Sequence, residues 1–190
     1  MDKDQSWTLF LDRDGVINER LPGAYIKDWN DFQFTPRALE ALVHFAHFFR
    51  RVFIVTNQQG IGKGLMTQVD LSVLHQKLKD AVISYGGRID GIYTCPDLAI
   101  QPNNCRKPNP ALALQAQAEF PDVDFKKSVM VGDSISDIQF GQELGMRTVL
   151  IDTKKEEREQ WAAAKVAGLE PQLTLPSFAS LPAHIHAFLS

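Results

Sequence analysis

The sequence is poor in cysteine, has no long apolar run and carries no strong excess of charge. Cys95 and Cys105 are the only cysteines among 190 residues, too few for the disulfide framework of a small secreted protein. No apolar run approaches the roughly 20 residues that cross a membrane. The first residues, MDKDQSWTLFL, contain two aspartates and no secretory hydrophobic region. We therefore expect no membrane partner and a reducing, cytoplasmic location.

The charge balance narrows the range of partners further. The 20 Lys and Arg residues face 23 Asp and Glu residues, which gives a net charge of -3, too acidic for a protein that coats nucleic acid. Hydrophobic residues make up 44% and charged residues 23%, so a disordered or collagen-like chain is excluded. We expect a monomer with no nucleic-acid partner and one domain over residues 1–190. Its motifs would lie within 9–152, followed by a helical or edge extension over 153–190.

Short β-branched segments alternate with segments of helical periodicity. Strands are expected at residues 8–11, 52–55, 89–94, 128–131, 148–151 and, at an edge, 173–175. Helices are expected near 38–45 with Thr35 as N-cap, at 71–85, from Asn109, from Ser134 to near Gly145, at 156–167 and at 178–189. This alternation predicts an α/β fold with a mainly parallel sheet. Function in such folds lies at the carboxyl ends of the strands.

Two aspartates follow the first expected strand. Asp12 and Asp14 are two residues apart, so both side chains can face the same side of an extended chain, and Gly15 permits a sharp turn after them. A solvated Asp-Gly turn is the simpler alternative for this motif taken alone.

A second pair of carboxylates follows the strand at 128–131. Asp133 lies at the strand end and Asp137 about one helical turn later, so both can converge on one hard cation. The alternative is that Asp133 and Ser134 only cap the next helix.

Two further strand ends carry groups that suit an anion. Thr56, Asn57 and Gln58 place a hydroxyl and two amides beside a glycine, which can cradle an oxyanion but is also common turn chemistry. Arg106 and Lys107 stand just before an expected helix start, where a helix terminus already favours anions. A solvated basic pair is the alternative.

In chain order, the four strand ends read Asp-x-Asp-Gly, Thr-Asn, Lys and Gly-Asp-Ser-x-x-Asp. This combination resembles the haloacid dehalogenase superfamily of phosphohydrolases. The longer stretches FLDRDGVIN, TNQQGI and CRKP resemble its branch of heptose bisphosphate and histidinol-phosphate phosphatases. The resemblance covers residues 9–152 and implies a Rossmann-like three-layer sandwich. Neither gap between the motifs has room for a large cap domain, so an open site is expected.

The resemblance also implies roles for individual residues. Asp12 would be the nucleophile that forms an aspartyl-phosphate, and Asp14 the acid and then the base. Mg²⁺ would be held by Asp12, the backbone carbonyl of Asp14 and Asp133, with Asp137 completing or orienting the shell. Lys107 and Thr56 would stabilise the phosphoryl group. The residues expected to contact the substrate are Asn18, Glu19, Asn57, Gln58 and Arg106.

One loop departs from the pattern of the family. Members of the branch usually carry four zinc ligands before Arg-Lys-Pro, and the residues at those positions here are Cys95, Asp97, Asn103 and Cys105. Two thiolates and an asparagine make a poor zinc site, so zinc is not expected. The loop would instead be held by hydrogen bonds, by packing or by a disulfide.

The main functional hypothesis is a Mg²⁺-dependent phosphomonoesterase for a small phosphorylated metabolite, with heptose bisphosphate favoured. Histidinol phosphate is the second candidate, because the motifs are shared. A nucleic-acid 3′-phosphate suits an open site but not the net charge. A phosphosugar-binding module without turnover is the alternative of another class, suggested only by the missing zinc ligands.

Overall fold

The protein is built around a six-stranded sheet with the order β3-β2-β1-β4-β5-β6, in which every neighbouring pair is parallel. The computed structural model describes residues 6–21 and 23–190. Its strands are β1 Thr8–Leu11, β2 Arg51–Asn57, β3 Gly91–Cys95, β4 Ser128–Gly132, β5 Arg147–Ile151 and β6 Leu173–Leu175. The expected α/β fold with a parallel sheet is confirmed.

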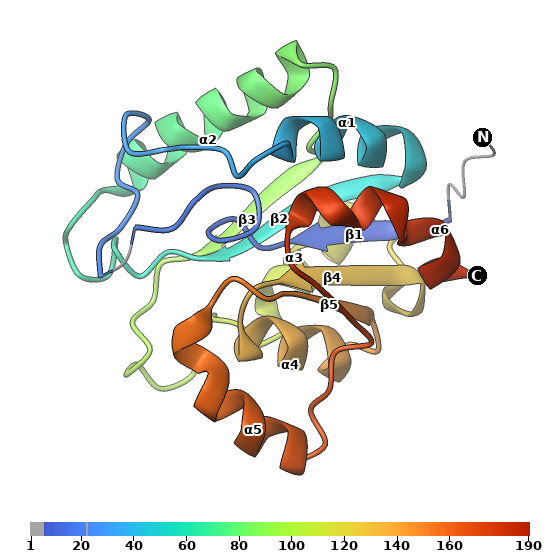
Figure 1. Ribbon diagram of the computed structural model, residues 1–190. Coiled ribbons are helices and arrows are strands. Elements are labelled where there is room, and N and C mark those ends of the chain that lie inside the picture. Colours follow the sequence, from blue (N-terminus) through green and yellow to red (C-terminus); the bar gives the residue numbers. More distant parts are fainter. Residues whose placement is uncertain (1–5, 22) are drawn as a thin grey trace.

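Helices cover both faces of this sheet (Figure 1). They are α1 Ala38–Phe48, α2 Gln68–Ser84, α3 Ala111–Glu119, α4 Ile135–Glu143, α5 Arg158–Val166 and α6 Ile185–Leu189. Short 3-10 helices are η1 Phe125–Lys127, η2 Lys155–Glu157 and η3 Phe178–Ala183. Leu9 and Leu11 of β1 pack with α1, α2, η3 and α6, whereas Phe10 packs with α3 and α4 on the other face. This alternation follows from the two-residue period of a strand.

Expected helices differ from the structure at their ends, and two of these differences have a clear cause. Arg37 precedes α1 with a φ of 60°, and Thr35, the expected N-cap, donates its hydroxyl to the carbonyl of Val16 at 2.8 Å instead. The closing helix expected at 178–189 is divided into η3 and α6. Pro182 lies inside η3, where its missing N–H and its ring disfavour a continuous α-helix through this segment.

The sheet order places a crevice at the end of β1. From β1 the chain first adds β2 and β3 on one side and then β4, β5 and β6 on the other. Leu11 of β1 is paired with Val131 of β4, so the loops that follow these two strands start next to each other and diverge. Ligands of open α/β sheets bind at this kind of topological switch point.

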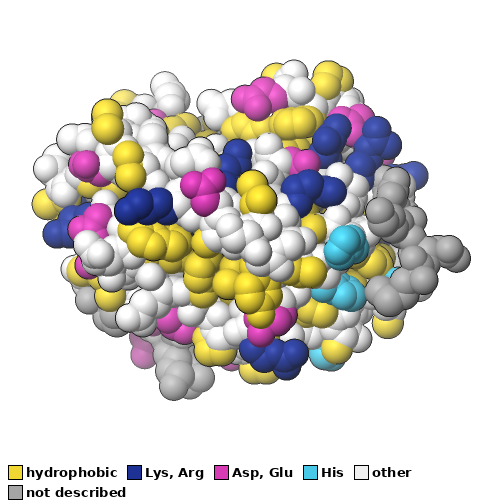
Figure 2. All heavy atoms as spheres, turned by 90° about the horizontal axis from the view of Figure 1, so that it is seen from above, with side chains coloured by type: hydrophobic (Ala, Val, Ile, Leu, Met, Phe, Trp, Pro, Cys, Tyr) yellow, Lys and Arg dark blue, Asp and Glu magenta, His cyan; other side chains and the backbone are white. Residues whose placement is uncertain are grey.

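The outer surface over α1 and α2 mixes apolar and charged side chains. Val69, Val73 and Ile83 of α2 are exposed. Figure 2 looks onto this side of the molecule and shows hydrophobic side chains interspersed with charges of both signs. Within the described residues, no helix has both the length and the apolar character needed to cross a membrane.

Phe45 joins α1 to the C-terminal segment and should be a major source of stability. Its ring is fully buried and lies 5.5 Å from that of Phe178. Phe45→Ala should lower the free energy of unfolding by about 3–5 kcal/mol, because it removes a large core side chain. Urea denaturation measures this, with exposed His47→Ala on the same helix as the control. Equal small losses in both variants would contradict the assignment of Phe45 to the core.

Candidate active site

A buried lysine links three strands at the centre of the site. Lys107 is 4% exposed, and its Nζ donates to Oδ1 of Asp12 at 2.8 Å and to the carbonyl of Val55 at 2.7 Å. The same Nζ forms an ion pair with Oδ1 of Asp137 at 2.6 Å. Asp12 follows β1, Val55 belongs to β2 and Asp137 lies in the first turn of α4 after β4. One ammonium group therefore connects the ends of β1, β2 and β4.

The pKa values of this pair reflect burial and mutual attraction. Burial raises the pKa of Asp12 to about 6, against the attraction of Lys107 and with added repulsion from Asp137. For Lys107 burial lowers the pKa, but the attraction of Asp12 and Asp137 outweighs it and the pKa is raised to about 12. Lys107 is therefore charged at neutral pH, and its charge favours the carboxylate form of Asp12.

Asp137 also caps α4. Its Oδ2 accepts hydrogen bonds from the backbone N–H of Asp133, the N–H of Ser134 and the hydroxyl of Ser134, at 3.1, 3.1 and 2.7 Å. Ser134 is the N-cap of α4, as expected, and forms a capping box with Asp137. Helix capping in this segment is confirmed, and the oxygen that does not cap, Oδ1, contacts Lys107. The role of Asp137 at a metal ion stays a prediction.

Asp133 offers a carboxylate oxygen without a matching donor. Its Oδ2 is buried and has no aligned hydrogen bond among the described residues, and it forms an ion pair with Nε of Arg20 at 3.0 Å. Burial, with repulsion from Asp12 and Asp137, raises the pKa of Asp133 to about 8. Oxygens of these three carboxylates lie within 4.8 Å of one another. Hard, crowded oxygen donors of this kind fit a divalent cation such as Mg²⁺.

Asp14 has a different environment from its neighbours. Burial raises its pKa, but the adjacent Arg13 and hydrogen bonds from Asn18, Arg13 and Gln58 more than offset this, so its pKa is lowered. Nη2 of Arg13 donates to both carboxylate oxygens, at 2.8 and 2.9 Å. Asn18 donates to Oδ1 at 2.9 Å and Gln58 to Oδ2 at 2.8 Å.

A cavity of about 1100 Å³ opens beside these carboxylates. The residues expected from sequence that line it are Asp12, Asp14, Glu19, Thr56, Asn57, Gln58, Arg106, Lys107, Asp133 and Asp137. The loop over residues 21–26, where described, and residues 176–179 form other parts of the wall.

Asn18 does not match its expected place in the substrate pocket. It is fully buried and is not part of the cavity lining. Its amide donates to Asp14 and to the carbonyl of Glu19. Asn18 therefore contacts Asp14 from outside the cavity lining, and its expected contact with the substrate stays a prediction.

Comparison with known proteins agrees with this geometry. A HAD-hydrolase-like family model matches residues 104–181. D-glycero-alpha-D-manno-heptose-1,7-bisphosphate 7-phosphatase of Mycobacterium tuberculosis is 44% identical over 133 residues, 70% of each chain. The corresponding beta-anomer phosphatase of Vibrio cholerae is 34% identical over 178 residues, 90% of this chain and 94% of the relative.

This chain belongs to the heptose bisphosphate phosphatase family of the haloacid dehalogenase-like hydrolases. The fold agrees with this assignment. A crystal structure of D,D-heptose 1,7-bisphosphate phosphatase from B. bronchiseptica, complexed with magnesium and phosphate, has a TM-score of 0.83 and 28% identity. The match covers 96% of this chain and 99% of that one. The protein is therefore a phosphomonoester hydrolase.

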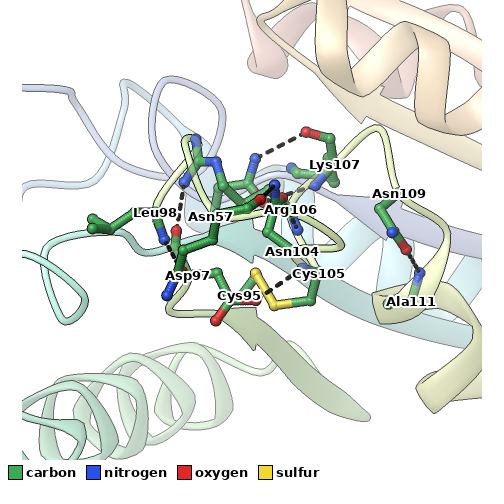
Figure 3. The surroundings of a disulfide bond; sticks show 11 residues. Asn57, Cys95, Asp97, Leu98, Asn104, Cys105, Arg106, Lys107, Asn109 and Ala111 are labelled. Atoms are coloured by element: carbon green, nitrogen blue, oxygen red, sulfur yellow. Dashed lines mark hydrogen bonds between the residues drawn. A yellow bond between two sulfur atoms is a disulfide. The ribbon is translucent and has the colours of Figure 1, made fainter.

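The phosphatase closes its cysteine loop with a disulfide between Cys95 and Cys105. Figure 3 shows this bond beside the turn that carries Arg106 and Lys107. Oδ2 of Asp97 accepts from the N–H of Cys105 at 3.0 Å, so Asp97 supports the same loop. Zinc binds cysteine as thiolate, and sulfurs joined in a disulfide do not provide thiolates.

The amide of Asn57 fixes the backbone of the lysine that follows this loop. Its Oδ1 accepts from the N–H of Lys107 at 3.0 Å. Gln58, next along the chain, donates to Oγ1 of Thr56 at 2.9 Å as well as to Asp14. The Thr-Asn-Gln motif therefore connects the lysine and Asp14, in addition to lining the cavity.

Sequence reasoning missed three residues of this site: Arg13, Arg20 and His75. Arg13 stands between the two motif aspartates, and the sequence gives no sign that it is fully buried. His75 lies in the apolar stripe of α2, between the buried Leu74 and Leu78. A polar ring at a core position needs a partner, and that was the available signal.

Gly15 is needed for close approach of the β1 turn to Asp133. Its φ is 91°, and a Cβ there would lie 2.1 Å from Oδ2 of Asp133. Gly15→Ala should lower Mg²⁺-dependent activity about 100-fold, because it misplaces this carboxylate. Titration of activity with Mg²⁺ measures the effect. Gly64→Ala is the matched control, since Gly64 has a φ of 69° but open space around it; equal losses would contradict the role of this contact.

The disulfide should stabilise the fold. Cys95 and Cys105 are 10 residues apart, and closing a loop of this size contributes about 2–3 kcal/mol. The double variant Cys95→Ala/Cys105→Ala should lose this amount in urea denaturation. Reductant should destabilise the wild type similarly and leave the double variant unchanged. Stoichiometric zinc in the reduced wild type would show that the loop is still a metal site.

Proposed function

We propose that the protein is a Mg²⁺-dependent phosphatase that removes the 7-phosphate of D-glycero-D-manno-heptose 1,7-bisphosphate. The observation that carries the proposal is the arrangement of Asp12, Lys107 and Asp133 at the floor of a cavity of about 1100 Å³. Relatives 34% and 44% identical are named for this reaction, and their names support the choice of sugar.

In the first step, a carboxylate oxygen of Asp12 attacks phosphorus and the ester P–O bond breaks. For this step Asp14 must carry a proton, although Arg13 and the hydrogen bonds lower its pKa before substrate binds. The negative charge of the bound phosphate raises that pKa and favours the protonated form. Asp14 then gives this proton to the departing ester oxygen, so the sugar leaves as an alcohol and an aspartyl-phosphate remains. Lys107 and the hydroxyl of Thr56 stabilise the charge on the phosphoryl oxygens. Both line the cavity, on the side where β2 ends.

In the second step, Asp14 removes a proton from water and the water oxygen attacks phosphorus. The bond between phosphorus and Asp12 breaks, which releases inorganic phosphate and regenerates the carboxylate. Magnesium, held by Asp12, the carbonyl of Asp14 and Asp133, would neutralise the repulsion between the acidic site and a phosphate dianion. Asp137 would keep its two contacts, to the N-terminus of α4 and to Lys107.

The remainder of the substrate would occupy the outer cavity. Arg106 and the exposed Glu19 both line it, so a cation is available for the second phosphate and a carboxylate for sugar hydroxyls. Action as a monomer, with one domain over residues 1–190, stays a prediction. A cytoplasmic location stays a prediction.

Phosphate release from a substrate panel tests the proposal. With Mg²⁺, kcat/KM for heptose 1,7-bisphosphate should exceed that for histidinol phosphate and simple sugar phosphates by at least about 10-fold, because only it fills both ends of the cavity. Both heptose anomers belong in the panel, since relatives are named for each. Preference for histidinol phosphate would overturn the proposed substrate but not the proposed phosphatase mechanism.

Asp12→Asn tests the nucleophile in the same assay. The variant should lose at least about a thousandfold in kcat, because an amide oxygen does not form the covalent intermediate. Asp152→Asn is the control, since Asp152 is exposed and outside the cavity lining. Turnover by Asp12→Asn close to that of the control would contradict the assignment of Asp12 as the nucleophile.

A further inference from the structure

Arg13 is a fully buried arginine beside the reacting groups. The residue as a whole has 0% exposure. Its Nε and Nη2 face Asp14, with Nε donating to Oδ1 at 3.2 Å and Nη2 at 2.8 Å. A buried guanidinium is tolerated when its charge is paired and its N–H groups have acceptors. The Asp14 carboxylate satisfies only one edge of it.

The other edge of this guanidinium meets a histidine from α2. Nη1 of Arg13 lies 3.0 Å from Nε2 of His75, and His75 is 8% exposed. An arginine only donates hydrogen bonds, so Nε2 of His75 must be the acceptor and the imidazole must be neutral with its proton on Nδ1. Burial, followed by the charge of Arg13, lowers the pKa of His75 to about 3, which agrees with a neutral ring at neutral pH.

We propose that His75 is a positioning residue for the phosphatase reaction. By accepting from Nη1 it fixes the plane of the Arg13 guanidinium, and the guanidinium in turn aims the carboxylate of Asp14 into the cavity. The proposal rests on the role of Asp14 given under the proposed function. His75 itself is not part of the cavity lining and touches neither substrate nor the reacting atoms.

The geometry shows why the orientation of Asp14 depends on Arg13. Asn18 contacts Oδ1 alone and Gln58 contacts Oδ2 alone. Arg13 is the one described residue that donates to both oxygens, so it sets the rotation of the carboxylate. A general acid must bring its proton within hydrogen-bond reach of the leaving oxygen. Without an acceptor on the far edge, the guanidinium gains freedom to turn and this alignment is lost.

A leaving-group series separates this role from a merely structural one. The probes are 2,4-dinitrophenyl, p-nitrophenyl and phenyl phosphate at saturating Mg²⁺, and kcat/KM reports the steps up to formation of the aspartyl-phosphate. Dinitrophenolate leaves without a proton, whereas phenolate needs one. His75→Leu should lower kcat/KM for phenyl phosphate about 10- to 100-fold, a part of what a general acid contributes. It should change kcat/KM for dinitrophenyl phosphate by less than about 3-fold, because that substrate does not depend on the acid.

Three further variants complete the experiment. His75→Gln restores an acceptor oxygen near the place of Nε2 and should recover the wild-type dependence on leaving group. His47→Leu makes the same change at an exposed histidine and should have no effect. Asp14→Asn removes the acid and should steepen the dependence more than His75→Leu does. Activity on dinitrophenyl phosphate also shows that the variants of His75 and His47 are folded. Circular dichroism shows this for Asp14→Asn, which also lacks the base of the second step.

The outcomes distinguish the role of His75 from the role of Asp14. Equal losses on all three probes in His75→Leu would assign His75 to folding alone and overturn the proposal. A steep dependence in Asp14→Asn with a normal one in His75→Leu would overturn the role of His75 and leave the proposed function standing. A normal dependence in Asp14→Asn would overturn the assigned role of Asp14, and the proposal for His75 with it.

Discussion

The site depends on how four carboxylates are kept together at the ends of β1 and β4. Lys107 lies between Asp12 and Asp137, and Arg13 lies beside Asp14. Removing one member of a buried pair typically costs about 3–5 kcal/mol, because the remaining charge is left without a partner. The two pairs are not equivalent, because burial outweighs the attraction of Lys107 at Asp12, whereas Arg13 and the hydrogen bonds outweigh burial at Asp14. The pKa of Asp12 is raised while that of Asp14 is lowered, although the two residues are almost adjacent in sequence.

Much of this arrangement could be predicted from sequence because it follows from local rules. The alternation of short strands and helices fixes a parallel sheet, and parallel strands bring their carboxyl ends to one edge. Asp12, Asp133 and Lys107 were expected there, and the structure brings them together. Ser134 was expected as an N-cap, and its capping box forms. These predictions needed only periodicity, the strand ends and the preferences of cap residues.

The remaining features depend on contacts between distant segments. Thr35 has the chemistry of an N-cap, but the nearby carbonyl of Val16 takes its hydroxyl. Asn18 was expected to face the substrate, whereas the turn after β1 directs it behind Asp14. The partnership of Arg13 with His75 spans 62 residues, and no local pattern connects the two. The type of a residue indicates which hydrogen bonds its side chain can form. The packing of distant segments decides which partner it contacts.

Residues 176–179 form a part of the cavity wall that is distant in sequence from the residues that carry out the reaction. The four clustered aspartates and Lys107 lie before residue 138, at or after the ends of β1, β3 and β4. The wall, by contrast, connects β6 at the sheet edge to η3, and η3 is anchored to α1 through Phe45 and Phe178. Substitutions in this late segment would reshape the cavity without disturbing a single reacting group. Substrate specificity could therefore change in evolution while the catalytic steps stay the same.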